Sequence, residues 1–368
     1  MIAIILSIIL VVYLSSIGSL IYGFSKVKKY HNTNLKPQTS FTIIVPFRNE
    51  AENLPNLLQS FSNLNYPMDL FEVILVDDSS TEKFAVSDFK FQVSVIDTIR
   101  VSNSPKKDAI ATAIQYVKNN WVITTDADCL VPENWLLIFD NYIQENKVLM
   151  LAGAVSYECE NSFLHHFQQL DLTSLQGATI GSFGLNKAFL CNGANFAYKK
   201  SLFNKLNGFE GNDKIASGDD VFLLQKAARF SSEKVHYLKA KEAIVITKPA
   251  ENWKSLFYQR VRWAAKTSSY ESTFGKILGL IVFFGNLSFV IGFFFLVLGV
   301  LSYPVFVLLA FFKFLLDFVL LYITNQFLTK IRIKSLILSS LLYPFFSSLV
   351  ALYSLFGSYE WKGRKFKM

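Results

Sequence analysis

The feature that most constrains this chain is the placement of its apolar residues, which gather at the two ends. No residue is charged from Ile2 to Phe24, and further apolar runs follow near residues 277–300, 305–324 and 336–356. A helix of roughly 20 apolar residues can cross a bilayer, and each run is about that long. The first run lacks a basic start and an Ala-x-Ala cleavage site, so it fits a retained anchor better than a signal peptide. We therefore predict one N-terminal membrane helix (residues 1–25) and a C-terminal set (residues 276–358).

A region of ordinary soluble composition, residues 36–271, separates the apolar ends. It is long enough to form one large α/β domain with its own core. Three lysines follow the first apolar run, and the positive-inside rule places them and the domain in the cytoplasm. The net charge of +8 is concentrated beside the apolar runs and in the tail at residues 359–368. This placement indicates contact with anionic lipid headgroups rather than with nucleic acid, for which we find no motif.

The positive-inside rule conflicts with the number of apolar runs. One span before the domain and three after it would leave the basic tail outside the cell. Either the last run, which Pro344 interrupts, re-enters the membrane without crossing it, or one of the predicted spans is wrong. Lys313 and Asp317 lie inside an apolar run at i, i+4 spacing, which predicts a pair that closes a helix contact or lines an acceptor path.

Strand-like and helix-like segments alternate through the first part of the middle domain. The predicted strands are residues 41–45, 71–76, 91–96 and the run that begins at Trp121. The predicted helices between them are residues 54–61 and 106–118, and Asn49 with Glu52 resembles a capping box before the first helix. This alternation predicts a mostly parallel, doubly wound sheet, whose ligands bind beyond the carboxyl ends of the strands.

Acidic residues stand at two of these strand ends. Asp126 and Asp128 follow the strand at Trp121, and Asp77 and Asp78 close the strand before it. Residues i and i+2 of an extended chain point to the same side, so Asp126 and Asp128 can face one ligand. Two carboxylates suit an octahedral Mg²⁺ or Mn²⁺ that also binds a diphosphate. The alternative is a solvated turn with no ligand.

The chain resembles the membrane-integrated family 2 glycosyltransferases, whose core has the nucleotide-sugar-binding GT-A fold. The resemblance covers almost the whole middle domain, in order, although Pro105 stands where a glycine is usual and Asp219 replaces the usual glutamate. The matching segments are residues 43–50, 76–80, 106–110, 125–129, 193–198 and 217–221, the Gln-x-x-Arg-Trp motif at 259–263 and the tail motif at 361–364. The resemblance implies a Rossmann-like, mostly parallel α/β domain in the cytoplasm, flanked by transmembrane α-helices.

The resemblance also implies a donor site. Asp126 and Asp128 would hold the divalent cation and, through it, the diphosphate of a nucleotide sugar, which we expect to be UDP-linked. We favour Asp128 as the direct ligand, and Asp126 could instead face the sugar or the ribose. Either Asp77 or Asp78 would accept hydrogen bonds from the base and ribose while the other caps the following segment. Lys106 would counter the charge of the nucleotide, or would simply be an exposed residue in the first turn of a helix.

On the acceptor side, Asp220 is the candidate general base that takes the proton of the attacking hydroxyl. The alternative role for Asp220 is an N-cap carboxylate of the helix that follows, and Asp219 could serve as that cap while Asp220 catalyses. One helical face carries Gln259, Arg262 and Trp263. On it, Arg262 could bind the diphosphate and Trp263 could offer an apolar surface to the acceptor. The alternative for this face is a cation and an aromatic ring of a membrane-interface belt.

Taken together, the sequence and the resemblance predict a metal-dependent glycosyltransferase at a bacterial-type inner membrane, and the resemblance implies that the enzyme is inverting. We favour a lipid or lipid-linked acceptor, because the three spans after the domain are few for a single chain to form its own channel for a polymer. The alternative enzyme is a processive synthase of a poly-hexosamine or β-glucan, which the complete Gln-x-x-Arg-Trp motif favours. The non-enzymatic alternative is a membrane protein that only binds or transports sugars. The sequence leaves the oligomeric state open.

Overall fold

The computed structural model describes residues 1–85, 88–212, 215, 217–329, 333–361 and 364–367. Two compact units share the chain. The sheet unit comprises residues 28–158 and 188–248, and the helical unit comprises residues 1–27, 159–187 and 249–368. Segments 159–187 and 249–271, which have soluble composition, therefore group with the apolar helices. Lys362 and Gly363 of the tail motif and Lys330 and Arg332 of the basic group lie outside the described residues.

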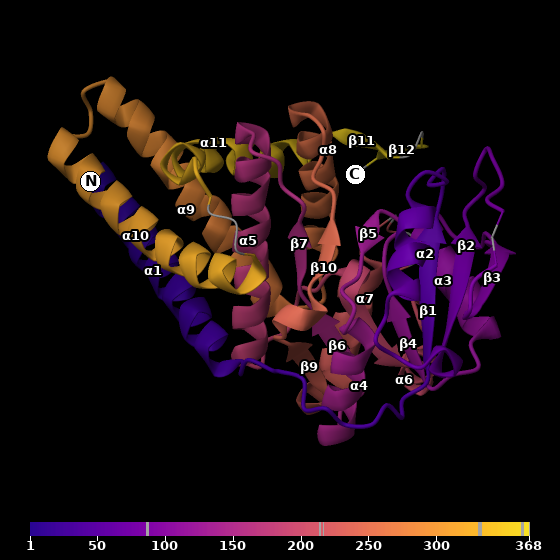
Figure 1. Ribbon diagram of the computed structural model, residues 1–368. Coiled ribbons are helices and arrows are strands. Elements are labelled where there is room, and N and C mark those ends of the chain that lie inside the picture. The colour runs from indigo at the N-terminus through magenta and orange to yellow at the C-terminus, as the bar shows by residue number, and fades with distance from the viewer. Residues whose placement is uncertain (86–87, 213–214, 216, 330–332, 362–363, 368) are drawn as a thin grey trace. The chain divides into compact units, whose positions relative to one another are not determined.

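The sheet unit is built on a seven-stranded sheet with the order β3-β2-β1-β4-β8-β6-β9 (Figure 1). Its strands are β1 (Phe41–Phe47), β2 (Phe71–Asp77), β3 (Gln92–Asp97), β4 (Trp121–Thr124), β6 (Met150–Gly153), β8 (Phe196–Lys199) and β9 (Val235–Leu238). The first four strands run parallel, and β8 runs antiparallel between β4 and β6. A second sheet joins β5 (Cys129–Leu130), β10 (Val245–Thr247) and β7 (Val155–Tyr157). The prediction of a mostly parallel α/β sheet is confirmed.

Helices connect these strands. They are α2 (Leu54–Ser62), α3 (Pro105–Tyr116), α4 (Trp135–Glu145), α6 (Lys200–Lys205) and α7 (Asp219–Ser231). Short 3₁₀ helices add η1 (Met68–Leu70), η2 (Gly193–Asn195), η3 (Ser232–Lys234) and η4 (Lys241–Ala243).

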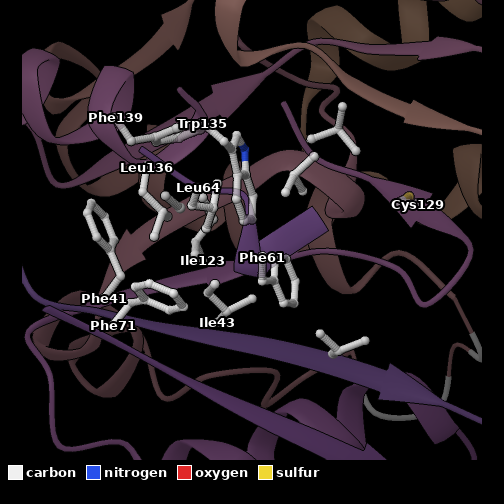
Figure 2. Packing of buried hydrophobic residues seen from close by; sticks show 14 of the residues in the cluster. Phe41, Ile43, Phe61, Leu64, Phe71, Ile123, Cys129, Trp135, Leu136 and Phe139 are labelled. Atoms are coloured by element: carbon white, nitrogen blue, oxygen red, sulfur yellow. The ribbon is translucent and has the colours of Figure 1, made fainter. Parts of the chain in front are cut away.

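The core of the sheet unit lies between one face of the parallel strands and helices α2 and α4 (Figure 2). Phe41 and Ile43 of β1 and Ile123 of β4 are fully or almost fully buried there. The rings of Phe61 and Trp135 stack with centroids 6.2 Å apart and planes 7° from parallel. Burying one such side chain contributes roughly 1.5–3 kcal/mol, so this layer holds the strand ends that carry the acidic turns in fixed positions.

The start of α2 differs from the prediction. The capping residue is Asn53, whose side chain makes no cap bond, and Pro55 lies in the first turn. Asn49 instead adopts a positive φ of 53°, and its side-chain oxygen accepts a hydrogen bond of 2.9 Å from the backbone N–H of Thr81. The predicted capping box was therefore wrong, because Asn49 ties the turn after β1 to the turn after β2.

The helical unit contains α1 (Ile2–Lys26), α5 (Phe163–Gly184), α8 (Trp253–Ala265), η5 (Lys266–Ser269), α9 (Thr273–Val297), α10 (Tyr303–Leu328) and α11 (Leu336–Tyr353), with the hairpin β11 (Ser358–Trp361) and β12 (Arg364–Lys367). Helices α1, α9, α10 and α11 are long and apolar enough to cross a membrane. They match the four apolar runs of the sequence. Helix α5 has no counterpart among the helices predicted above.

Two kinds of contact join α1 to its neighbours, a close approach at glycines and a hydrogen bond to an ion pair. A Cβ atom at Gly184 of α5 would overlap the carbonyl oxygen of Gly23, so the backbones of α1 and α5 meet at glycines, as small residues allow between membrane helices. In α10, Lys313 donates to Asp317 at 2.7 Å, and Asp317 also accepts from the Tyr13 hydroxyl of α1 at 2.6 Å. The predicted Lys313–Asp317 pair therefore closes a helix contact.

Candidate active site

Both acidic turns lie at the same edge of the main sheet. Asp77 is the last residue of β2, and Asp126 and Asp128 follow β4 closely. Strand β1 lies between β2 and β4 and pairs with both in parallel. The carboxyl ends of the three strands therefore point the same way, which is the edge where sheets of this kind bind ligands.

Asp77 and Asp78 have different surroundings. Asp77 is 1% exposed and accepts hydrogen bonds from the Ser80 N–H at 2.8 Å and from Lys83 at 3.1 Å. Burial alone would raise the pKa of the Asp77 carboxyl, but these hydrogen bonds outweigh burial and hold the pKa below its usual value. Asp77 thus caps its own turn, while the Asp78 carboxylate accepts a bond of 3.2 Å from Arg100.

Arginines that the sequence did not single out organise this edge. Arg48 donates to the backbone carbonyls of Asp78 and Ser79, both at 2.8 Å. Arg100 lies between Asp78 and Asp108, with its Nε 3.5 Å from the Asp108 carboxylate. The contacts of Arg48 and Arg100 with the turn at residues 78–79 join residues at least 22 positions apart along the chain, so no local spacing could indicate them.

Lys106 gathers carboxylates from two other elements. Its Nζ lies 2.6 Å from Asp126 and 3.6 Å from Asp219, which is the first residue of α7. Burial alone would lower the pKa of Lys106, but the negative charges of Asp126, Asp219 and Asp220 outweigh it and raise the pKa. The ammonium therefore stays charged and holds the turn after β4 close to the start of α7.

The backbone of η2 packs directly on this cluster. The Gly193 N–H donates to Asp220 at 2.8 Å. A Cβ atom at position 193 would lie 3.2 Å from the Asp219 carboxylate and 3.3 Å from Lys106 Nζ. We define the carboxylate cluster as Lys106, Asp126, Gly193, Asp219 and Asp220. It brings together four segments of the sheet unit around one ammonium.

The predicted capping role of Asp219 was wrong. Gly218 is the N-cap of α7 and has a φ of 84°, which glycine adopts at little cost. Asp219 is the first helical residue, and its side chain turns toward Lys106 instead of capping the helix. Its charge still favours the positive end of the helix dipole.

The carboxylates of Asp126 and Asp128 are of the type that holds a divalent cation. In the described parts of the chain, no group of three or more His, Cys, Asp or Glu side chains is arranged to hold a metal. Mg²⁺ is commonly held by one or two carboxylates together with water and the phosphates of a substrate, so a two-carboxylate turn suffices. Asp128 is half-buried beside Cys129, and burial together with the neighbouring Asp128 and Asp126 charges raises the pKa of the Cys129 thiol well above its usual value. Mg²⁺ and Mn²⁺ prefer oxygen ligands to thiols, so the two carboxylates are better ligands for such a cation than Cys129.

Gln259, Arg262 and Trp263 belong to the helical unit. The structure confirms that all three lie on one helix, α8, at the predicted spacing. Their role in binding or catalysis remains a prediction.

Part of the candidate site lies in a segment that matches a known protein family. The model of the family "Glycosyl transferase family 2" matches residues 42–206. This segment is therefore similar to glycosyl transferase family 2. The family 2 segment includes the acidic turns, Lys106 and Gly193, and it ends before α7. The resemblance read from the sequence is therefore confirmed.

Individual relatives agree with the family 2 match. The chain is 24% identical over 241 residues to the protein named "Probable glycosyltransferase YdaM" of Bacillus subtilis (strain 168), covering 63% of this chain and 56% of that one. It thus spans little more than half the length of this curated relative. The structure of the mannosyltransferase PcManGT from Pyrobaculum calidifontis, in complex with GDP-Man and Mn²⁺, superposes with a TM-score of 0.59 at 16% identity. The match covers 96% of this chain and 99% of that one, so the two share a fold.

Proposed function

We propose that this protein is an inverting glycosyltransferase that moves a sugar from a nucleotide diphosphate sugar to a hydroxyl of a lipid or lipid-linked acceptor at the membrane. The observation that carries the proposal is the carboxylate cluster at the ligand-binding edge of the sheet. Its residues Lys106, Asp126 and Gly193 lie within the segment that matches the family 2 model, and Asp219 and Asp220 join it from α7. Four helices long and apolar enough to cross a bilayer support an acceptor that resides in the membrane.

Donor binding is assigned to the acidic turns. Asp77 caps its own turn through the Ser80 N–H, whereas Asp78 accepts its hydrogen bond from the side chain of Arg100. We therefore assign contact with the base and ribose to Asp78. Asp126 and Asp128 would hold a divalent cation, Mg²⁺ or Mn²⁺, which when bound stabilises the charge that develops on the leaving diphosphate. The GDP-Man and Mn²⁺ of the PcManGT structure support a nucleotide sugar and a cation by analogy of fold. We propose a UDP-linked donor.

The base is assigned to Asp220. The hydrogen bond from the Gly193 N–H orients its carboxylate, and an ionised carboxylate within reach of the acceptor hydroxyl can take the proton as the oxygen attacks the sugar. Lys106 keeps the surrounding negative charge balanced. From the motif resemblance we propose that Arg262 binds the diphosphate and that Gln259 and Trp263 contact the substrates. We further propose that the sheet unit is cytoplasmic.

The test is a panel of UDP- and GDP-linked sugars offered to the purified full-length protein, with release of nucleotide diphosphate as the readout. We expect turnover with one donor, its loss on chelation of divalent cations, and its return on addition of Mg²⁺ or Mn²⁺. Asp220→Asn should abolish turnover, while Asp69→Asn, which changes an exposed aspartate of the same unit, should not. Full turnover in Asp220→Asn would refute the proposed mechanism.

A processive polysaccharide synthase is the second candidate, since the Gln-x-x-Arg-Trp motif is complete on α8. Membranes supplied with the radiolabelled donor separate the two. Label in the lipid extract supports the lipid acceptor, and label only in material of high molecular mass supports the synthase.

A further inference from the structure

Arg260 lies inside the Gln-x-x-Arg-Trp motif but is not one of its defining residues. The side chain of Arg260 is 5% exposed, and its Nε donates to the carboxylate of Asp171 on α5, which is 4% exposed. Both residues belong to the helical unit. The pair links α8 to α5 in the interior of that unit.

The same guanidinium contacts two motif residues. Its Nη1 donates to the side-chain oxygen of Gln259, and its central carbon lies 4.3 Å from the centroid of the Trp263 ring. An arginine can serve three partners at once, because its planar fork offers several donors and a face that stacks on aromatic rings. The hydrogen bond fixes the Gln259 amide with its oxygen toward Arg260 and its NH₂ group on the other side.

Stability alone does not explain such a pair. Burying two charges costs much of what their attraction returns, and apolar replacements of buried ion pairs are often neutral or stabilising. A buried arginine that contacts the side chains of two motif residues is better explained by what it holds in place.

We propose that Arg260 is a positioning residue: anchored by Asp171, it fixes the amide of Gln259 and the ring of Trp263 in the orientation that the transfer reaction requires. This inference rests on the proposed function, in which Gln259 and Trp263 contact the substrates. In this proposal Arg260 acts through Gln259 and Trp263 and does not itself contact the donor or the acceptor.

The test compares full-length variants in detergent: Arg260→Gln, Asp171→Asn, and the double variant Arg260→Gln/Asp171→Asn. Each single variant leaves one buried charge without its partner, so thermal stability and kcat should both fall. The double variant removes both charges, so its thermal midpoint should recover toward that of the wild type. Its kcat should stay at least roughly tenfold below wild type, because misplacing a positioned group by about 1 Å can cost a hundredfold.

Controls separate positioning from a general effect of charge. Lys254→Gln removes an exposed charge from the same helix and should change neither property. Arg260→Lys keeps the charge but loses the fork, so it should be stable and slow. If the double variant regains both its thermal midpoint and its kcat, the pair is only structural and the inference is overturned.

A second readout needs no turnover. Quenching of Trp263 fluorescence by acrylamide, obtained as the difference from Trp263→Phe, should increase in the double variant because the ring has lost its cation. Unchanged quenching would overturn the positioning role. A wild type that turns over no donor would refute the proposed function, and the quenching would then still show whether Arg260 holds the Trp263 ring in place.

Discussion

Gly193 is the residue at which the carboxylate cluster has no room for a larger side chain. Its Cβ position lies 3.2–3.4 Å from Asp219, Lys106 and Asp220, which is closer than most contacts allow. Gly193→Ala should therefore displace the cluster by a few tenths of an ångström while leaving the core intact. We expect kcat to fall roughly tenfold or more with little change in the thermal midpoint. Steady-state kinetics beside a thermal melt checks this, and unchanged kcat would show that the cluster does not need this packing.

Lys239 gives the sheet unit a pH dependence. Burial, with a smaller effect of Lys29, lowers the pKa of Lys239 to about 8, whereas the unfolded chain has a pKa of about 10.4. Between these values the unfolded chain binds more protons than the folded chain, so the free energy of unfolding rises with pH. Lys239→Met should therefore be more stable than the wild type near pH 7, and this advantage should shrink by about pH 10. Denaturant titrations of both proteins across this range test it, and a constant difference would contradict the prediction.

The residues of the candidate site differ in how well their roles can be predicted from the sequence. The acidic turns at Asp77 and Asp126 were predictable, because parallel strands must bring their carboxyl ends to one edge. The partner of Asp219 was not, because Lys106 lies far away along the chain and only the fold brings them within 3.6 Å. Asn49 was misassigned for a similar reason, since its partner Thr81 belongs to the next strand-end turn.

At the scale of elements, the segment before α7 depends on a buried lysine of α3. Lys107 is 2% exposed and donates to the backbone carbonyls of Asn212 at 2.6 Å and Ile215 at 2.9 Å. Lys107→Met would leave these carbonyls without that donor, which costs about 1–3 kcal/mol. We expect lower stability and a lower kcat, because α7 carries Asp219 and Asp220. Lys118→Met, which changes an exposed lysine just after the same helix, is the control. Equal effects in both variants would contradict this role of Lys107.

The contact between α1 and α5 depends on glycine. A side chain at Gly184 would overlap the backbone of Gly23, so Gly184→Val should separate the two helices. Overpacking of this kind typically costs about 1–3 kcal/mol, and here the obstacle is backbone that cannot rotate away. The thermal midpoint in detergent should fall, whereas Gly18→Ala, which meets open space on α1, should leave it unchanged. An unaltered midpoint in Gly184→Val would show that α1 can shift along α5.

Helix α5 also shows why composition alone could not set the unit boundaries. Its buried side chains include Gln168, Gln169, Asp171 and Thr173, so the segment lacks the apolar stripe by which an amphipathic helix is usually found. Its composition is that of a soluble protein although it packs against apolar helices. The four long apolar helices were predictable because their length and composition depend on no partner.

On the scale of the whole molecule, α11 is the helix that decides the membrane topology. It is the shortest of the four apolar helices, at 18 residues, and Pro344 lies inside it. Its Phe346 packs against Trp253 and Phe257 of α8, which is a helix too rich in charge for the bilayer core. In Figure 1, α11 does not follow the direction that α1 and α10 share. These features favour a helix that lies at the membrane surface.

If α11 does not cross, every basic segment falls on one side of the membrane. The lysines after α1, the basic residues at 330–334 and the tail would then all face the cytoplasm, as the positive-inside rule requires. A reporter fused after Met368 should therefore report the same side as one inserted between residues 28 and 40. A reporter between α9 and α10, near Gly299, should report the opposite side. If the tail reporter agrees with the one near Gly299, then α11 spans the membrane and the basic tail lies outside, against the charge rule.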